Sequence, residues 1–236
     1  MARVLDRPAT RPPAVPALPR SSVGKKAVMA VSGIILVLFL VAHMIGNLHA
    51  FRGADDFNHY SHWLRTIGEP VLPGRGFLVL MEVGLLVSVV AHMASAILLW
   101  RQARRARPVR YQHHRRVQQS YASRTVRWGG VIIAAFVVWH LLDMTFGTVN
   151  PAGTGTTPYE RLVAAFRQPA ITAFYVLAVV LVGFHLQHGV WSALATLGVS
   201  NRRRERTLKT AAAALALLLT LGFLVVPAAV AIGVVS

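Results

Sequence analysis

The sequence contains no cysteine, which excludes iron–sulfur clusters, Cys-ligated zinc sites and disulfides within this chain. Any redox centre must therefore be held by His, Met or Tyr side chains. Carboxylates are also scarce, since eight Asp and Glu stand against 25 Lys and Arg, for a formal charge of +17. Such a charge indicates nucleic-acid binding when it forms a patch on a soluble fold, whereas here the basic residues lie between apolar segments. We therefore attribute the charge to membrane topology and expect no nucleic-acid partner.

Residues 1–23 form a polar tail with five prolines, and we predict that this tail is disordered because it cannot build a core. The apolar run after it is about 20 residues long and lacks a small-residue cleavage motif, which favours an uncleaved helix over a signal peptide. Residues 24–236 are predicted to form one membrane domain.

Five apolar runs are each near or above the roughly 20 residues that a helix needs to cross the hydrocarbon core. They cover approximately residues 26–48, 77–100, 126–148, 169–197 and 208–233. Helices are the economical way to satisfy the backbone of such runs in lipid. We therefore predict an all-α membrane protein with five transmembrane helices, of which four form a haem-binding bundle and the fifth packs outside it.

Basic residues are concentrated on one side of these spans. Of the 25 Lys and Arg, 20 lie in residues 1–26, 101–127 and 200–209, and five lie in the two opposite loops. The positive-inside rule therefore predicts a cytoplasmic N-terminus and an external C-terminus.

Four of the five spans each carry a histidine at membrane depth. The first carries His43, and a similar stretch 97 residues later carries His140. The other two spans carry His92 and His185. Ionisable side chains inside a membrane are costly and mark functional sites by default. One imidazole on each of four helices suggests two metal sites, and the size and depth of those sites suggest haem.

The depths of the histidines predict how they pair. With a rise of 1.5 Å per residue, His43 and His140 lie about 10 to 13 Å from the outer ends of their helices, and the other two lie about 23 Å in. We therefore predict an outer pair, His43 with His140, and an inner pair, His92 with His185. Each pair comes from helices that run in the same direction, which allows two stacked bis-imidazole irons in one bundle.

Small residues occur at the levels where porphyrin rings need room. Gly33 and Gly130 each lie ten residues, or about 15 Å, inward of an outer-pair histidine. Four further small residues flank the inner pair: Ala91, Ser95, Gly183 and Gly189. Close packing of membrane helices also favours small residues, so this simpler explanation stays open for each of them.

Each histidine also has a simpler explanation, because a histidine in a membrane helix can hydrogen-bond a neighbouring helix. Four histidines at depths matched by pairs are harder to explain in that way. His188 is the rival ligand, since it lies three residues after His185 and shares its face, but the depth of His185 matches that of His92. The remaining histidines lie in loops and are expected to be solvated: His49, His59, His62, His113 and His114.

Two carboxylates, Glu82 and Asp143, lie inside the spans, both in the outer third. Because Glu82 precedes His92 by ten residues and Asp143 follows His140 by three, we expect both near the outer iron and assign them to proton transfer at a quinone site. Tyr175 lies at the same level and is expected to assist. The alternative for each acid is a helix-end side chain that reaches the interface. Further candidates for closing the site are Asn47, Arg52 and Trp63.

The stretches around the four histidines resemble the cytochrome b membrane anchor of succinate:quinone oxidoreductases, in the single-chain class with five helices and two haems. The matching stretches are FLVAHMIGN at 39–47, VVAHMASA at 89–96, VVWHLLD at 137–143 and FHLQHGVWSAL at 184–194. The resemblance implies that His43 and His140 bind the outer haem b and that His92 and His185 bind the inner one.

The resemblance also implies partners and a reaction. A flavoprotein subunit, which carries the dicarboxylate chemistry, and an iron–sulfur subunit would dock on the cytoplasmic face of a bacterial cell membrane. Electrons would pass through the two haems to a quinone, most simply menaquinone, and the whole complex could oligomerise. With protons taken from outside, the membrane potential would drive the uphill reduction of menaquinone, at about 2.3 kcal/mol per charge per 100 mV.

One position departs from fumarate-reducing members of this class, which can carry a glutamate two residues before the fourth ligand. Here that position is Gly183, which favours succinate oxidation. Several residues at the inner side are expected to contact the propionates of the inner haem or the iron–sulfur subunit: Lys25, Lys26, Arg124, Arg127, Arg202 and Trp128.

Three other functions remain open on the sequence alone. A di-haem cytochrome of a formate dehydrogenase, hydrogenase or nitrate reductase would usually carry two of its histidines on one helix. A transporter whose histidines relay protons or bind a cation would have broken helices, whereas only Pro227 interrupts a span here. In a purely structural anchor, alanine in place of the histidines would change neither assembly nor spectrum.

Overall fold

The computed structural model describes residues 21–106 and 121–236, with residues 121–127 described by their backbone alone. This part of the chain is helical and contains no strand. The elements in order are α1 (Ser22–Leu48), the 3-10 helix η2 (His49–Arg52), α2 (Ala54–Thr66), α3 (Gly76–Arg105), α4 (Tyr121–His140), the π-helix η3 (Leu141–Thr145), α5 (Pro158–Phe166), α6 (Pro169–Thr196) and α7 (Glu205–Ala231).

Five segments are long and apolar enough to cross a membrane, and they correspond to α1, α3, α4 with η3, α6 and α7. The predicted all-α membrane fold with five spanning helices is therefore confirmed. Many of their large apolar side chains face outward, among them Leu38, Leu86 and Val131, each more than 60% exposed. Such a surface is suited to lipid rather than to water.

The first helix begins earlier than predicted. The side chain of Ser21 accepts a hydrogen bond from the N–H of Gly24 at 2.9 Å, so Ser21 caps a helix that starts at Ser22, inside the tail expected for residues 1–23. The rest of that tail lies outside the described residues, as do His113 and His114.

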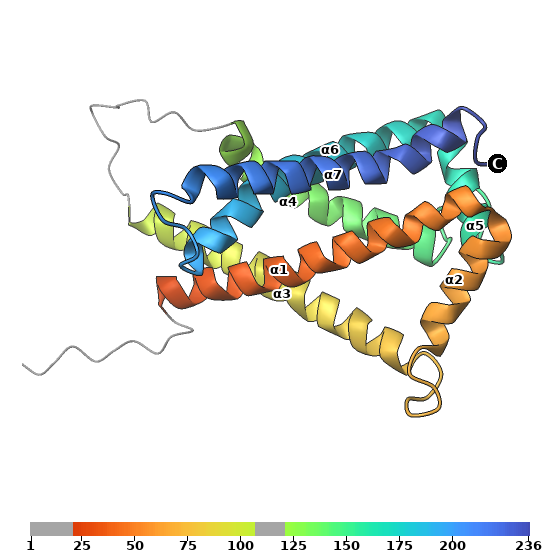
Figure 1. Cartoon of the computed structure of the whole chain (residues 1–236), viewed down its shortest axis with the longest axis horizontal. Coiled ribbons are helices and arrows are strands. Elements are labelled where there is room, and N and C mark those ends of the chain that lie inside the picture. The colour runs from red at the N-terminus through yellow and green to blue at the C-terminus, as the bar shows by residue number, and fades with distance from the viewer. Residues whose placement is uncertain (1–20, 107–120) are drawn as a thin grey trace, which may run out of the picture.

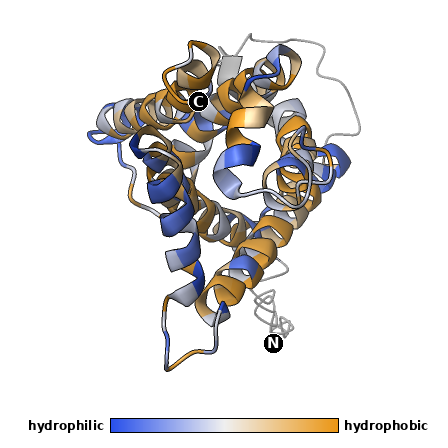
Figure 2. Cartoon of the chain, turned by 90° about the vertical axis from the view of Figure 1, so that its right-hand side faces the viewer, coloured by the Kyte–Doolittle hydropathy of each residue, from blue (hydrophilic) through white to orange (hydrophobic). Residues whose placement is uncertain are grey.

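The long helices alternate in direction, so that their starts and ends lie at two opposite ends of the molecule (Figure 1). The starts of α1, α4 and α7 and the ends of α3 and α6 lie together, and we call this arginine-rich end the inner end. The opposite, outer end carries η2, α2, α5 and the C-terminus. In Figure 2, which looks onto the outer end, hydrophobic residues follow the long helices and hydrophilic ones gather in the short elements.

Two short helices, α2 and α5, close the outer end where the sequence suggested only loops. The backbone N–H of Tyr159 in α5 donates to the side chain of Asn58 in α2 at 3.2 Å, and the Tyr159 ring lies 6.0 Å from that of Phe57. The hydroxyl of Tyr159 donates to the carbonyl of Ser236 at 3.3 Å, which fixes the C-terminus to the same cap.

The start of α5 carries a sequence pattern that could have revealed it. Thr157 and Glu160 form a capping box, in which the N–H of Glu160 donates to the Thr157 hydroxyl and the N–H of Thr157 donates to the Glu160 carboxylate at 2.8 Å. The backbone and side chain of Thr157 hold the pKa of Glu160 below its usual range. Pro158 at the first helical position completes a standard helix start.

The helices do not form a symmetric four-helix bundle. Helix α3 packs mainly on α1 at the inner end and diverges from the other spans toward the outer end (Figure 1). Helix α6 contacts α4, α7 and α1. Helix α7 packs along α6 and also against α1 and carries no histidine, an arrangement compatible with the prediction that the fifth helix lies outside the four histidine-bearing helices.

Small residues explain why α7 comes so close to its neighbours. A Cβ on Gly222 of α7 would overlap the Met44 sulfur of α1, and a Cβ on Gly183 of α6 would overlap the Thr220 hydroxyl of α7. Met44 packs with buried Leu186, Ala216 and Leu219 into one apolar cluster of α1, α6 and α7. Gly183 therefore allows α6 and α7 to pack closely, which is the simpler explanation that the sequence offered for a small residue at this position.

We predict that Gly183→Val lowers the stability of the protein, because the added side chain must displace Thr220, whose hydroxyl donates to the Ala216 carbonyl at 2.7 Å. The expected cost is about 1–3 kcal/mol, the usual range for overpacking. Thermal unfolding of the detergent-solubilised protein measures it as a lower Tm. Gly84→Val is the matched control, since it makes the same change at an exposed position of another spanning helix, α3, where a Cβ meets nothing within 4 Å. Equal Tm values for the two variants would contradict the prediction.

Candidate functional site

The outer histidine pair is brought together by α1 and α4. His43 lies in the outer part of α1 and His140 is the last residue of α4, and their ring centroids are 5.7 Å apart at a nearly perpendicular angle of 85°. Phe39 stacks on His43 at 5.2 Å, and Phe223 of α7 lies 5.8 Å from the same ring. Phe136 lies 5.8 Å from His140. Aromatic rings from three helices therefore surround the outer pair.

The inner histidine pair is brought together by α3 and α6. The ring centroids of His92 and His185 are 6.1 Å apart. His188 lies one turn further along α6, where its ring is 6.3 Å from that of Trp191. The structure thus places His185 opposite His92, as the depths predicted.

The backbone of α1 fixes the orientation of His92. The Nδ1 atom of His92 lies 3.0 Å from the carbonyl oxygen of Met29. A Cβ on Gly33 would lie 3.2 Å from Cε1 of the same ring, so the missing side chain at position 33 lets the imidazole reach the helix backbone. A carbonyl accepts only, so Nδ1 carries the proton and Nε2 keeps its lone pair for a metal.

Both pairs have the donor set and spacing that a haem iron requires. Metal–imidazole bonds of 2.0–2.1 Å put the ring centroids of two opposed imidazoles roughly 6 Å apart. The described residues contain no group of three or more His, Cys, Asp or Glu able to hold a metal ion by themselves. A pair of histidines supplies two axial ligands and leaves the other positions to a macrocycle, which is the ligation used in haem proteins. The Nδ1 of His185 is buried and has no partner among the described residues.

Beyond the outer pair, the chain builds a buried polar network around Asp143. This carboxylate is 0% exposed and lies in the π-helical turn η3 that follows His140. It accepts hydrogen bonds from the Tyr175 hydroxyl at 2.6 Å and from the Asn150 side chain at 2.7 Å. The Tyr175 hydroxyl in turn lies 3.5 Å from Nδ1 of His140. A π-helical turn inside a helix frequently marks a functional site.

The same network holds the loop that follows η3. Asn150 also donates to the Arg161 carbonyl at 3.1 Å, and the Arg161 guanidinium donates to the Thr145 carbonyl at 2.7 Å. Asn150 and Arg161 were not among the residues singled out by sequence. No pattern in the sequence reveals them, because their part depends on the turn made by η3.

The expected partner of Asp143, Glu82, lies elsewhere. Glu82 is exposed near the start of α3 and forms an ion pair with Arg75 at 3.6 Å, on the part of α3 that diverges from the other spans (Figure 1). The structure therefore groups Asp143 and Tyr175 with the outer pair and places Glu82 at the surface.

The other residues expected to close the outer site lie in or beside the outer cap. Arg52 pairs with Asp56 at 3.5 Å, and Trp63 is 51% exposed with its ring 5.8 Å from that of Tyr60. Asn47 is half-buried near the end of α1. His49, expected to be solvated, instead lies 2.5 Å from the Asp56 carboxylate and stacks on Tyr60.

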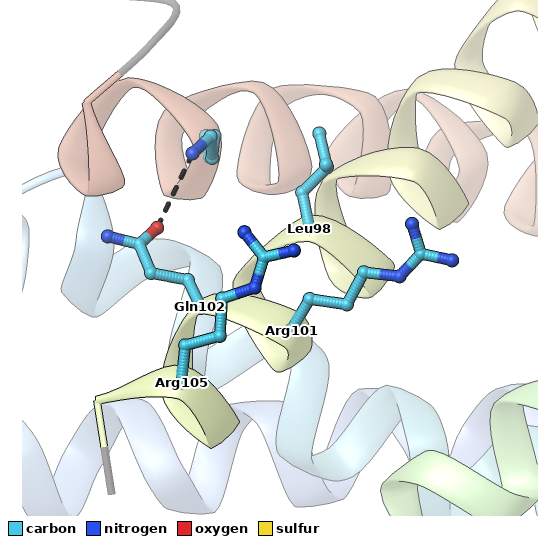
Figure 3. Close-up of a pocket in the computed structure, with 5 residues that line it drawn as sticks. Leu98, Arg101, Gln102 and Arg105 are labelled. Atoms are coloured by element: carbon cyan, nitrogen blue, oxygen red, sulfur yellow. Dashed lines mark hydrogen bonds between the residues drawn. The ribbon is translucent and has the colours of Figure 1, made fainter. Parts of the chain in front are cut away.

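At the inner end, residues of α1 and α3 line an open basic cavity of about 260 Å³ (Figure 3). Its lining residues are Lys25, Leu98, Arg101, Gln102 and Arg105. The Lys25 ammonium donates to the Gln102 side chain at 3.4 Å, the contact drawn in Figure 3. None of the lining residues is acidic.

Of the other inner residues expected from sequence, Lys26 lies near the start of α1, Arg202 is exposed, and Trp128 is 77% exposed. The side chains of Arg124 and Arg127 lie outside the description. A residue that sequence reasoning missed is Trp191, whose indole N–H is buried with no acceptor among the described residues. The Lys209 ammonium lies 4.7 Å from the centre of the Trp191 ring, which adds a cation–π contact.

Comparison with known proteins agrees with this arrangement. The chain is 24% identical over 177 residues to the succinate dehydrogenase cytochrome b558 subunit of Bacillus subtilis (strain 168), a match that covers 73% of this chain and 78% of that protein. No solved structure matches the chain. Residues 101–225 match the model of the succinate dehydrogenase/fumarate reductase transmembrane subunit family. Because this match covers more than half of the chain, including α4 and α6 with one histidine of each pair, the protein belongs to that family.

Proposed function

We propose that this protein carries electrons through two b haems, from an iron–sulfur subunit docked at its inner end to a quinone at its outer end. The observation that carries the proposal is the presence of two facing histidine pairs at different depths, with ring centroids 5.7 Å and 6.1 Å apart. The Bacillus relative supports it, since that protein is named a cytochrome b558 subunit of succinate dehydrogenase. The family match disfavours the alternatives of another respiratory cytochrome, a transporter or a bare anchor.

In this proposal His43 and His140 hold the outer haem, and His92 and His185 hold the inner one. The haem supplies one-electron redox chemistry, and the chain supplies axial imidazoles and a dry apolar surrounding. Gly33, which contacts His92, lies ten residues before His43 on α1, so the two pairs are separated by about 15 Å along that helix. Helix α1 thus contributes to both proposed haem sites.

The inner end suits the docking of the catalytic subunits. Lys25, Arg101 and Arg105 line one cavity, and none of them has an ion pair in the described part of the chain. We propose that these cations and Arg202 meet the iron–sulfur subunit or the propionates of the inner haem. The flavoprotein that acts on the dicarboxylate would then sit on the cytoplasmic side of a bacterial membrane, beyond the iron–sulfur subunit.

At the outer end, quinone reduction needs protons as well as electrons. Glu82 is an exposed carboxylate near the outer end of α3, and Asp143 is the carboxylate beside the outer pair. We propose that protons enter on this side, so that electrons cross from the inside toward menaquinone in the direction of succinate oxidation. Each elementary charge then gains about 2.3 kcal/mol per 100 mV of membrane potential.

The haem content of histidine variants tests the ligand assignment. The pyridine haemochrome assay of the purified complex is expected to give two b haems per chain. Succinate should reduce at least part of this haem. His43→Ala, His140→Ala and the double variant should each retain one haem, because the two residues hold the same iron. His43→Ala combined with His92→Ala should retain none. His59→Ala, on the exposed face of α2, is the control and should retain two.

A well-folded wild-type protein without haem would contradict the whole proposal. If His43→Ala and His140→Ala each lost a different haem, the double variant would retain none, and the pairing would be wrong.

Dissipation of the membrane potential tests the direction of charge movement. In intact vesicles, a protonophore should slow menaquinone reduction by succinate, because the reaction loses about 2.3 kcal/mol per charge per 100 mV. Succinate oxidation by an artificial acceptor that draws electrons from the catalytic subunits is the control and should not change. If the protonophore slowed both reactions equally, or slowed neither, the proposed movement of electrons across the membrane would be contradicted.

Glu82→Gln tests proton entry at the outer end. We expect quinone reduction to fall by about 10²-fold, the lower range for loss of a proton-transferring group, with two haems retained. Glu69→Gln, a matched change of an exposed carboxylate in the nearby loop, should leave the rate unchanged. The steady-state rate with a water-soluble menaquinone analogue measures the effect, and an unaltered rate in Glu82→Gln would rule this residue out.

A further inference from the structure

We propose that Asp143 and Tyr175 are positioning residues for the outer haem: Tyr175, held by Asp143, fixes the ring of His140 so that its Nε2 faces the iron. This inference rests on the proposed function, since it takes His140 to be an axial ligand. In this inference Asp143 holds Tyr175 in place, whereas the sequence predicted that Asp143 transfers protons.

The first argument is that each oxygen of the Asp143 carboxylate already accepts a hydrogen bond within the protein. One oxygen of Asp143 accepts from Tyr175 at 2.6 Å and the other accepts from Asn150 at 2.7 Å. The residue is 0% exposed, and Asn150 is 7% exposed. Breaking such bonds leaves a buried acceptor unsatisfied, which is costly. A group held in this way is suited to fixing its neighbours rather than to exchanging protons with a mobile quinone.

The second argument concerns the single proton of the phenol. Tyr175 has one O–H, and its short contact shows that it donates this hydrogen to Asp143. The hydroxyl oxygen therefore presents only lone pairs to His140, whose Nδ1 lies 3.5 Å away, at the long limit of a hydrogen bond. Nδ1 of His140 must then carry the proton, and Nε2 remains free to bind a metal.

The third argument is that Tyr175 cannot turn away. Its side chain belongs to a residue only 4% exposed, and its ring packs edge-on against Phe136 at 5.2 Å and Phe166 at 5.1 Å. These two rings come from α4 and α5, so packing on two sides fixes the phenol. A rigid acceptor defines the orientation of the imidazole better than a mobile one.

The inner pair shows the same arrangement built from other atoms. There Nδ1 of His92 donates to the Met29 carbonyl at 3.0 Å, while its partner His185 has a buried Nδ1 without an acceptor in the described part of the chain. One histidine in each pair is thus oriented through Nδ1. The outer pair differs because the Asp143 carboxyl group stands behind the acceptor, and a carboxylate partner of this kind raises the basicity of a ligand.

This difference leads to a measurable outcome. A more basic imidazole stabilises the oxidised iron, so the Asp143–Tyr175 pair should lower the midpoint potential of the outer haem. Tyr175→Phe removes the acceptor and keeps the ring. In the intact complex we expect two haems per chain, an upward shift in the midpoint potential of one haem, and a changed low-spin ferric electron paramagnetic resonance signal for that haem alone.

Two further variants make the test specific. Asp143→Asn keeps the shape of the side chain and removes the charge, and it should shift the same haem in the same direction. Tyr159→Phe is the matched control, because Tyr159 is another buried tyrosine, 8% exposed, whose hydroxyl bonds the C-terminus instead of a histidine. It should leave both potentials and both signals unchanged.

The outcomes separate this inference from its alternatives. Unchanged potentials and signals in Tyr175→Phe and Asp143→Asn would overturn it, and a lower rate of quinone reduction in that case would assign the pair to proton transfer. Loss of the outer haem alone, with the inner haem, its potential and the assembly with the catalytic subunits retained, would support it. Loss of both haems or of assembly in both variants would indicate a purely structural part and overturn it. Absence of haem from the wild-type complex would refute the proposed function instead.

Discussion

The absence of water from the hydrocarbon core is the constraint on which the rest of this structure depends. Every polar group at that depth must find its partner within the protein. The spanning backbone meets the constraint by forming helices. Asp143 meets it with two hydrogen bonds to its carboxylate, and His92 meets it by reaching a backbone carbonyl of α1. In the described part of the chain, four buried side-chain nitrogens escape this rule: Nδ1 of His185 and the indole of Trp191 on α6, and the indole of Trp139 and Nε of Arg161 toward the outer end. His185 is one of the ligands that we propose for the inner haem.

The sequence allowed the spans and the histidine pairs to be predicted, because both depend on distance along a helix axis. An apolar run of fixed length defines a span, and a fixed rise per residue converts position into depth. Depth was enough to predict which histidines pair, His43 with His140 and His92 with His185, although their part as ligands stays a prediction. The ends of the helices differed from expectation by a few residues, since capping by Ser21 is a local effect that hydropathy does not measure.

What the sequence did not reveal depends on rotation and on close contact between helices. Depth placed Glu82 and Asp143 at a similar level, but the direction of α3 leaves one at the surface and the π-helical turn buries the other. The close contacts of α7 with α6 and α1 were missed for a related reason. Helix α7 lacks ionisable side chains after Lys209, which suggested a peripheral helix. Gly183 and Gly222 allow its close approach to α6 and α1, but this role can be recognised only once the residues that face these glycines are known.

The placement of Phe223 has a consequence for how the protein is made. This ring packs against His43, yet it belongs to α7, which follows the four histidine-bearing helices in the chain and is synthesised after them. A nascent chain that ends after α6 already holds all four histidines, but one side of its outer pair still faces lipid. In the proposed function, the outer haem can thus enter its site from the side during a period of synthesis that ends when α7 packs against His43.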